Sequence, residues 1–322
     1  MRKIFSLAVI IALAFTVPAF SAVPLSGPYE GGSRVALVTG GEQGEYHAFG
    51  MTLAEAVSRA TSTQVRAIAS GGAMQNIEAL AKGTAQLAFI QSDVGFYASR
   101  GTRLFNQKYS GFSTVAVLYP EPVQIVTLNP EITHVENLRG KTVSIGAEGS
   151  GTYFNAVDVL TAYGMGFEDI TPVFGSFGDS VEALKEGKID AAFIVAGTPT
   201  PAVTELAKAG KVYLVSFDDK HILDLIAKCP YYAKCDLPKS TYGTDDDDMT
   251  VAVHSVIVAR DDVRMEDVYN FMYGVFENSG KLANPRAKSL TLRNAASYPA
   301  VPYHSGAVKY LGEKDILVSG KK

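Results

Sequence analysis

The chain has 322 residues, of which 47% are hydrophobic, and carries 29 lysines and arginines against 33 aspartates and glutamates. A formal net charge of −4 at pH 7 provides no basic surface of the kind that nucleic-acid-binding proteins need, which excludes that class of function. The length exceeds what one hydrophobic core usually supports, so the chain is expected to form two lobes.

Residues 1–21 are predicted to be a secretory signal peptide. Arg2 and Lys3 precede an uncharged, mostly apolar stretch through residue 20, and Ala19 and Ser21 fit the small positions of a cleavage site, with Ala22 as an alternative end. An uncleaved membrane anchor is disfavoured because the run is short for a span of about 20 residues. Cleavage leaves 27 basic against 33 acidic residues, a formal charge of −6, and predicts a periplasmic protein.

The two cysteines, Cys229 and Cys235, would lie in an oxidising compartment after export. Paired thiols in such a compartment become disulfides, so we expect a bridge between them. The alternative is two free thiols, because closing so short a loop would stabilise the fold by only about 2 kcal/mol.

The remaining chain repeats one unit: a short aliphatic run, a glycine-rich turn and a segment with helical period. This rhythm predicts an α/β fold with largely parallel sheets. The predicted strands of the first series are 35–38, 65–69, 87–90, 115–118 and 125–128, and those of the second are 142–145, 171–174, 191–195 and 212–217. The predicted helices between them are 46–59, 74–82, 153–163, 180–186 and 201–209.

The rhythm breaks after residue 217. A helix at 219–228 leads into an irregular polar stretch at 231–248, and a strand at 251–259 and helices at 265–282 and 305–312 complete the chain. We therefore expect lobe one to comprise residues 33–123 and 225–322, and lobe two residues 124–224. The segment Tyr119-Pro120-Glu121-Pro122 is predicted to be either a hinge between the lobes or a rigid turn. The mature protein is expected to be a monomer that closes on a ligand.

Two glycine-rich turns each follow a strand and open a helix: Thr39-Gly40-Gly41-Glu42-Gln43-Gly44 and Gly146-Ala147-Glu148-Gly149-Ser150-Gly151-Thr152. Backbone amides at such helix starts bind anions. We predict that Ser150, Gly151 and Thr152 hold a ligand carboxylate while Gly40, Gly41 and Gly44 line the opposing lobe. The alternative is that the glycines only permit tight turns and the hydroxyls only cap helices. Neither turn completes a nucleotide-binding motif.

Polar side chains at other strand ends are candidates for the remaining contacts, because ligands sit at the carboxyl ends of strands in open α/β sheets. Gln91, Ser92 and Asp93 follow the third predicted strand, and Tyr119 and Glu121 lie in the proline-rich segment. Asp93 or Glu121 could accept an ammonium group if the ligand is an amino acid. The alternative for Asp93 is an ordinary helix cap.

Catalytic and metal-binding patterns are missing from the sequence, so we expect no enzyme, no cofactor and no metal. Glu148 stands where a serine-hydrolase elbow around Ser150 would need glycine. The acidic run 245–248 lacks the glycine and the distal glutamate of a calcium loop. The histidines never approach metal-ligand spacing; they are His47, His134, His221, His254 and His304.

The mature chain resembles the TAXI family, the solute-binding subunits of tripartite ATP-independent periplasmic (TRAP) transporters. The resemblance rests on ordered motifs along its whole length: Thr39-Gly40-Gly41 with Gly44 and Tyr46, Gly71-Gly72 with Asn76, residues 88–94, 118–121, 138–141, 149–152 and 184–191, Ala196-Gly197 with Pro199, and residues 250–253 and 301–307. It implies a two-lobed type II periplasmic-binding-protein fold, with Tyr46 among the residues of the ligand cleft. It also implies a solute such as glutamate, glutamine or 2-oxoglutarate, and delivery to ion-driven TRAP membrane permease subunits.

Three residues depart from the family pattern. Glu45 and His47 stand where a small hydroxyl residue and a tyrosine are usual, and Ala73 replaces a common serine. In the cleft, Glu45 would repel a ligand carboxylate or recruit a cation; alternatively, both Glu45 and His47 point to solvent. The predicted function is a transport receptor. The alternatives are an extracellular ligand-sensing module of the same fold and, with no assembled nucleophile and base to support it, a secreted enzyme.

Overall fold

The computed structural model describes residues 27–321 apart from residues 43, 104, 298 and 300. The predicted signal peptide therefore lies outside the described residues. None of the helices in the described part of the chain is long and apolar enough to cross a bilayer.

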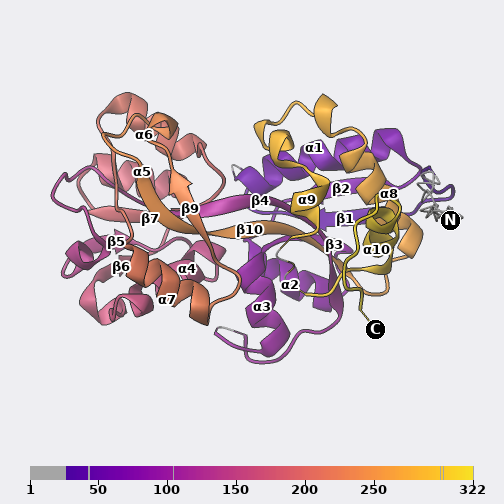
Figure 1. The fold of residues 1–322 in the computed structure, drawn as a ribbon, viewed down its shortest axis with the longest axis horizontal. Helices are drawn as coiled ribbons and strands as arrows, with labels where there is room; N and C mark the ends of the chain where they lie inside the picture. The colour runs from indigo at the N-terminus through magenta and orange to yellow at the C-terminus, as the bar shows by residue number, and fades with distance from the viewer. Residues whose placement is uncertain (1–26, 43, 104, 298, 300, 322) are drawn as a thin grey trace, which may run out of the picture.

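The chain folds into two α/β lobes that lie side by side and are joined by two long strands (Figure 1). These strands are β4 (Phe112–Thr127) and β10 (Asp248–Arg260), and they pair with each other in antiparallel fashion. They run through the middle of one continuous sheet with the strand order β2-β1-β3-β10-β4-β7-β5-β6, while β8 pairs with β4 and β9 pairs with β10. The predicted two-lobed α/β fold is confirmed.

Lobe one, at the right of Figure 1, contains one set of parallel strands and the C-terminal helices. Its strands are β1 (Arg34–Val38), β2 (Gln64–Ile68) and β3 (Leu87–Gln91). Its helices are α1 (Glu45–Ala60), α2 (Ala73–Ala81), α3 (Ser92–Arg100), α8 (Met265–Phe276), α9 (Leu292–Ala295) and α10 (Ser305–Gly312), with the short 3-10 turn η5 (Pro285–Ser289). Every residue of β3 is buried, which agrees with the uninterrupted apolar run of residues 87–90 before Gln91.

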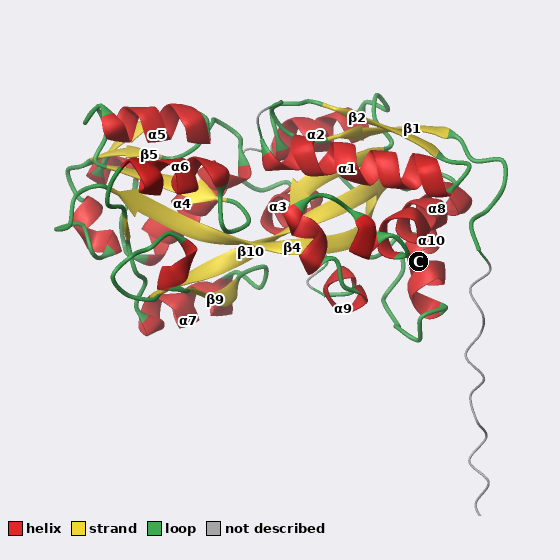
Figure 2. Cartoon of the chain, turned by 90° about the horizontal axis from the view of Figure 1, so that it is seen from above, coloured by secondary structure: helices red, strands yellow, loops and turns green. Residues whose placement is uncertain are grey.

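Lobe two repeats the same construction at the other end of the crossing strands (Figure 2). Its strands are β5 (Thr142–Ser144), β6 (Thr171–Val173), β7 (Ala191–Val195), β8 (Tyr213–Leu214) and β9 (Ala233–Leu237). Its helices are α4 (Gly151–Ala162), α5 (Phe177–Lys185), α6 (Pro201–Ala209) and α7 (Asp219–Lys228).

The proline-rich segment differs from the prediction, because it does not separate two strands. Residues 115–118 and 125–128 were expected to form two strands, but β4 continues through Pro120 and Pro122, which lie opposite His254 and Ala252 of β10. The pairing of β4 with β7 on its other edge begins only at Val123. Among the described residues, the prolines therefore lie where β4 pairs with β10 alone. Their missing N–H groups cost fewer hydrogen bonds between strands at this position.

The second boundary between the lobes is best placed within β10. The first part of β10 pairs with β9 from Asp248 to Ala252, and α7 packs against both α4 and β9. The predicted irregular stretch at 231–248 thus contains a strand of lobe two. We propose that the chain returns to lobe one along β10 and not at residue 225.

The two cysteines are free thiols in this structure. Cys229 follows the last residue of α7, and Cys235 lies in β9, where its sulfur contacts the carbonyl oxygen of Asp236 at 3.7 Å. The expected disulfide is therefore not formed here, and the bridge in exported protein stays a prediction.

Candidate functional site

The carboxyl ends of β1, β3, β5 and β7 meet where the two lobes face each other. A cavity of about 150 Å³ lies at this junction, where open α/β sheets bind ligands. Lobe one lines it with Gly40, Gly44, Glu45, Tyr46, Gly72, Ala73, Gln91 and Glu121, and lobe two with Ser150, Gly151, Thr152, Phe177, Val195 and Ala196.

A larger cavity of about 500 Å³ adjoins the first. The two share six lining residues, which are Gly44, Glu45, Ser150, Thr152, Phe177 and Ala196. The larger cavity extends over the start of α5 and the start of α6, from residues 175–178 to 200–202. We treat the two hollows as one interlobe site, because both glycine-rich turns line them.

The structure brings most of the predicted binding residues together. Those that line the smaller cavity are Gly40, Gly44, Tyr46, Gln91, Glu121, Ser150, Gly151 and Thr152, and Gly41 lines the larger one. Ser92, Asp93 and Tyr119 line neither cavity. The Ser92 hydroxyl instead accepts a hydrogen bond from the His254 amide at 3.1 Å, and Tyr119 is buried beside Phe49 with 1% of its surface exposed.

The start of α4 forms the lobe-two wall of the site. Ser150 is the N-cap of this helix, and its hydroxyl accepts a hydrogen bond from the Tyr153 amide at 3.2 Å. A Cβ atom on Gly151 would lie 1.2 Å from Oε1 of Gln91, so the Gln91 side chain of lobe one occupies the space that any larger residue would need here. The amides at the helix start and the helix dipole make this wall receptive to an anion.

The lobe-one wall carries a buried carboxyl group. Glu121 is 2% exposed, and its Oε2 accepts a hydrogen bond from the Tyr46 hydroxyl at 2.9 Å. Burial raises the pKa of Glu121 well above its usual value; the Tyr46 hydrogen bond lowers this pKa by less, and the nearby Asp93 carboxyl raises it further. A protonated carboxyl at neutral pH, or a carboxylate paired with a cation, can therefore occupy this wall.

A buried network ties the lobes together beneath the cavity. Nε2 of Gln91 donates to Oδ1 of Asn155 at 2.9 Å, and Nδ2 of Asn155 donates to Oδ2 of Asp93 at 3.0 Å. On the next turn of α4, Asp158 accepts hydrogen bonds from Tyr97 and Arg103 of lobe one. Asp93 thus acts within the lobe contact and not as a side chain of the cavity.

Sequence reasoning missed Arg286, which stands behind Glu45 at the edge of the site. Nε of Arg286 lies 3.0 Å from Oε1 of Glu45, and the two side chains are 9% and 16% exposed. Glu45 therefore neither points freely to solvent nor needs an external cation. His47 contacts Oγ1 of Thr39 through Nδ1 at 3.0 Å. In the sequence, Arg286 lies in a stretch for which no helix or strand was predicted. This position is the one signal that could have drawn attention to it.

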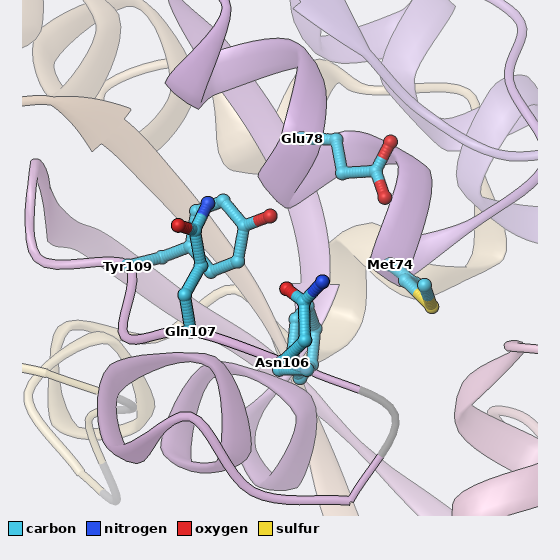
Figure 3. A pocket seen from close by; sticks show the side chains of 6 residues that line it. Met74, Glu78, Asn106, Gln107 and Tyr109 are labelled. Carbon is cyan, nitrogen blue, oxygen red and sulfur yellow. The ribbon is translucent and has the colours of Figure 1, made fainter.

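Another hollow, of about 330 Å³, lies on lobe one alone. Figure 3 shows Met74 and Glu78 on α2 facing Asn106, Gln107 and Tyr109 on the segment after α3. It contains neither glycine-rich turn and no residue of lobe two. It therefore lacks the paired walls that a receptor closing around its ligand needs, and we do not assign the binding site to it.

One group of described residues has metal-ligand proximity: ligand atoms of Glu136, Asp218 and His221 lie within 4.8 Å of one another. The two carboxylates are exposed, and Oδ2 of Asp218 already contacts Nδ1 of His221 at 2.5 Å. Asp218 also caps α7 by accepting a hydrogen bond from the His221 amide. We therefore assign this group to helix capping.

Solved structures of low sequence identity share the fold. One described as a periplasmic transporter matches with a TM-score of 0.53 and 15% identity, covering 89% of this chain and 95% of that chain. R. palustris Rpa4515 with adipate matches with a TM-score of 0.52 and 18% identity, covering 77% of this chain and 83% of that one. The alkanesulfonate-binding protein SsuA from Xanthomonas axonopodis pv. citri, bound to MOPS, matches with a TM-score of 0.50 and 16% identity, covering 87% and 83%.

These matches show a two-lobed fold that periplasmic binding proteins use. The two proteins whose names state a role are a transporter and a binding protein, not enzymes. The sequence profile of the NMT1-like family matches residues 37–314, which includes both glycine-rich turns and both crossing strands. With the family match spanning both lobes, the chain belongs to the NMT1-like family.

Proposed function

We propose that this chain is the periplasmic solute receptor of a membrane transporter and binds a small carboxylated metabolite between its lobes. One observation carries the proposal: a single cavity is lined by glycine-rich helix starts from both lobes. A site divided between two lobes lets ligand binding change their relative position, which is what a receptor needs to signal its loaded state to a partner.

The start of α4 supports a carboxylate as the anchored group. Amides at a helix start and the helix dipole stabilise an anion, and Ser150 and Thr152 place hydroxyl groups beside this helix start. Two proteins with this fold were solved with organic anions, adipate in one and MOPS in the other. Both ligands carry acidic groups, which agrees with an anion-binding cleft.

Glu121 favours an amino acid, glutamate or glutamine, over an oxo acid such as 2-oxoglutarate. Its carboxyl group lies in the same cavity as the start of α4, so one wall suits a ligand carboxylate and the other suits a ligand ammonium. A second carboxylate of the chain, on Glu45, is already neutralised by Arg286. Burying a charged carboxyl beside an uncharged ligand group would cost free energy that an ammonium group recovers.

The partner is proposed to be the membrane permease of a TRAP transporter, in agreement with the TAXI resemblance of the sequence. The receptor would act as a monomer in the periplasm, after removal of residues 1–21. Transport would then depend on an ion gradient that the permease uses, because the receptor only captures and presents the solute.

A thermal-shift screen of the mature chain tests the proposal. The panel contains L-glutamate, L-glutamine, 2-oxoglutarate and adipate, each beside a matched alcohol without a carboxylate. A solute at 100 times its Kd adds about 2.7 kcal/mol to the free energy of unfolding, which raises the melting temperature by about 5 °C. Stabilisation by the alcohols but by none of the carboxylates would overturn the proposal.

A further inference from the structure

We propose that Arg286 is a positioning residue that latches the two lobes together, holding the residue 197–199 segment of lobe two against lobe one. The latch itself follows from the contacts of Arg286; its effect on solute affinity rests on the proposed receptor function. It would keep the cleft closed without using any atom of the solute.

The contact with lobe two consists of three consecutive backbone carbonyls that follow β7. Nη1 of Arg286 donates to the carbonyl oxygen of Thr198 at 2.6 Å, and Nη2 donates to those of Gly197 at 2.7 Å and Pro199 at 2.9 Å. A guanidinium group presents its donors in a fixed plane, so one arginine can bind several acceptors that a lysine ammonium could not span.

The contact with lobe one is an ion pair with the first residue of α1. Nη2 of Arg286 lies 3.1 Å from Oε2 of Glu45, and Nε lies 3.0 Å from Oε1. Because both side chains are largely shielded from solvent, salt screens this pair less than a surface pair. Glu45 therefore fixes the direction of the guanidinium and balances its charge, while Arg286 reaches across to the other lobe.

The lobe-two residue under the guanidinium is a glycine for a steric reason. A Cβ atom on Gly197 would lie 2.7 Å from Cζ of Arg286, which is closer than nonbonded carbon atoms approach. On the opposite side, the guanidinium lies 5.7 Å from the centre of the Tyr119 ring, within the range of a cation–π contact. The guanidinium is thus enclosed by both lobes.

The latch bears directly on the binding site, because the segment that it holds forms part of the wall. Ala196 lines both cavities, Thr200 lines the larger one, and residues 197–199 connect them. When only the closed form binds a solute tightly, the apparent Kd rises as the closed fraction falls. Losing the charge-assisted hydrogen bonds of Arg286 should therefore weaken solute binding tenfold or more.

Small-angle scattering of the mature chain without any solute tests the latch. The wild type should give a smaller radius of gyration than Arg286→Gln, because loss of the Arg286 contacts lets the two lobes separate more often. Arg286→Lys should also give a larger radius than the wild type, because the ammonium retains the charge but not the planar set of donors. Gly197→Ala probes the same contact from lobe two, because the added Cβ would press on Cζ and Nε of the guanidinium. Arg260→Gln is the matched control, since Arg260 pairs with Asp262 within lobe one.

A scattering curve of folded Arg286→Gln or Gly197→Ala that superimposes on that of the wild type would overturn the latch. If Arg286→Gln does not fold, Gly197→Ala and Arg286→Lys decide the question. No solute enters this experiment, so the two proposals can fail separately. Stabilisation by the alcohols but by none of the carboxylates in the thermal-shift screen would overturn the proposed function and leave the latch standing. Unchanged radii would overturn the latch and leave the proposed function standing.

Discussion

Buried carboxyl groups distinguish the contact between the lobes. Asp93 is fully buried and Glu121 is 2% exposed. Burial and then the nearby Asp158 carboxyl raise the pKa of Asp93 to about 8. At neutral pH such a group retains its proton in the folded chain and loses it in the unfolded chain. Proton uptake on folding therefore links stability to pH.

Replacing Asp93 by asparagine should flatten the dependence of stability on pH. Between about pH 4 and pH 8 the folded chain binds the Asp93 proton and the unfolded chain does not, so the free energy of unfolding falls as pH rises. One group contributes a slope of at most about 1.4 kcal/mol per pH unit. Urea unfolding of wild type and Asp93→Asn at pH 5, 6 and 7 measures the difference. Parallel pH profiles would contradict a raised pKa at this residue.

Replacing Glu121 by glutamine should change which solute is preferred. The wild type is expected to bind L-glutamate at least tenfold more tightly than 2-oxoglutarate, because the ligand ammonium can pair with the Glu121 carboxylate. Glutamine keeps the shape but not the charge, so the ratio of the two affinities should fall towards one. Competition calorimetry measures this ratio, and an unchanged ratio in Glu121→Gln would remove Glu121 from the ammonium site.

At the scale of elements, the start of α4 has both a structural and a proposed binding role. Ser150→Ala removes the hydroxyl that accepts from the Tyr153 amide, and loss of such an N-cap costs about 1 kcal/mol. We expect a lower urea midpoint for this variant, with an unchanged denaturant slope. Ser176→Ala is the matched control, because Ser176 caps α5 in the same way. If Ser176→Ala lowers the urea midpoint and Ser150→Ala leaves it unchanged, the cap at Ser150 contributes nothing to stability.

The connection from α7 to β9 contains the two cysteines. Burial raises the pKa of Cys235 to about 11 and that of Cys229 above its usual value, so little of either thiol is the reactive thiolate. We expect slow oxidation in air but a Cys229–Cys235 bridge in protein exported to the periplasm. Thiol titration after denaturation should find no thiols in exported protein and two in cytoplasmic protein. Two thiols in the exported form would contradict the bridge.

Local signals located most elements, and non-local pairing explains the exceptions. The predicted helices 201–209, 219–228 and 305–312 match α6, α7 and α10, because their starts carry Pro201, the Asp218 cap and the His304 cap. The strand β9 was missed since it has a polar sequence and pairs only with the edge of β10. The break predicted in β4 was wrong. Whether a strand tolerates proline depends on which of its two edges is paired with a neighbouring strand, and a single sequence does not show this.

At the scale of the whole molecule, the glycine-rich turns were predictable and the latch was not. Each turn follows its own strand, so the sequence alone placed both at the carboxyl edge of a sheet. Arg286 is separated from Glu45 by 241 positions in the sequence and from Thr198 by 88. Its role depends on how the C-terminal segment packs over lobe one and reaches lobe two, which no local pattern encodes.

The central claim is that both lobes contribute to one solute site, and calorimetric titration with L-glutamate tests it most directly. Thr152→Val removes a hydroxyl from the lobe-two wall, and Glu121→Gln removes a charge from the lobe-one wall. Each should weaken binding about tenfold or more. Glu78→Gln, in the hollow of Figure 3, should bind as the wild type does. Wild-type affinity in both cavity variants, with a loss in Glu78→Gln, would contradict the account.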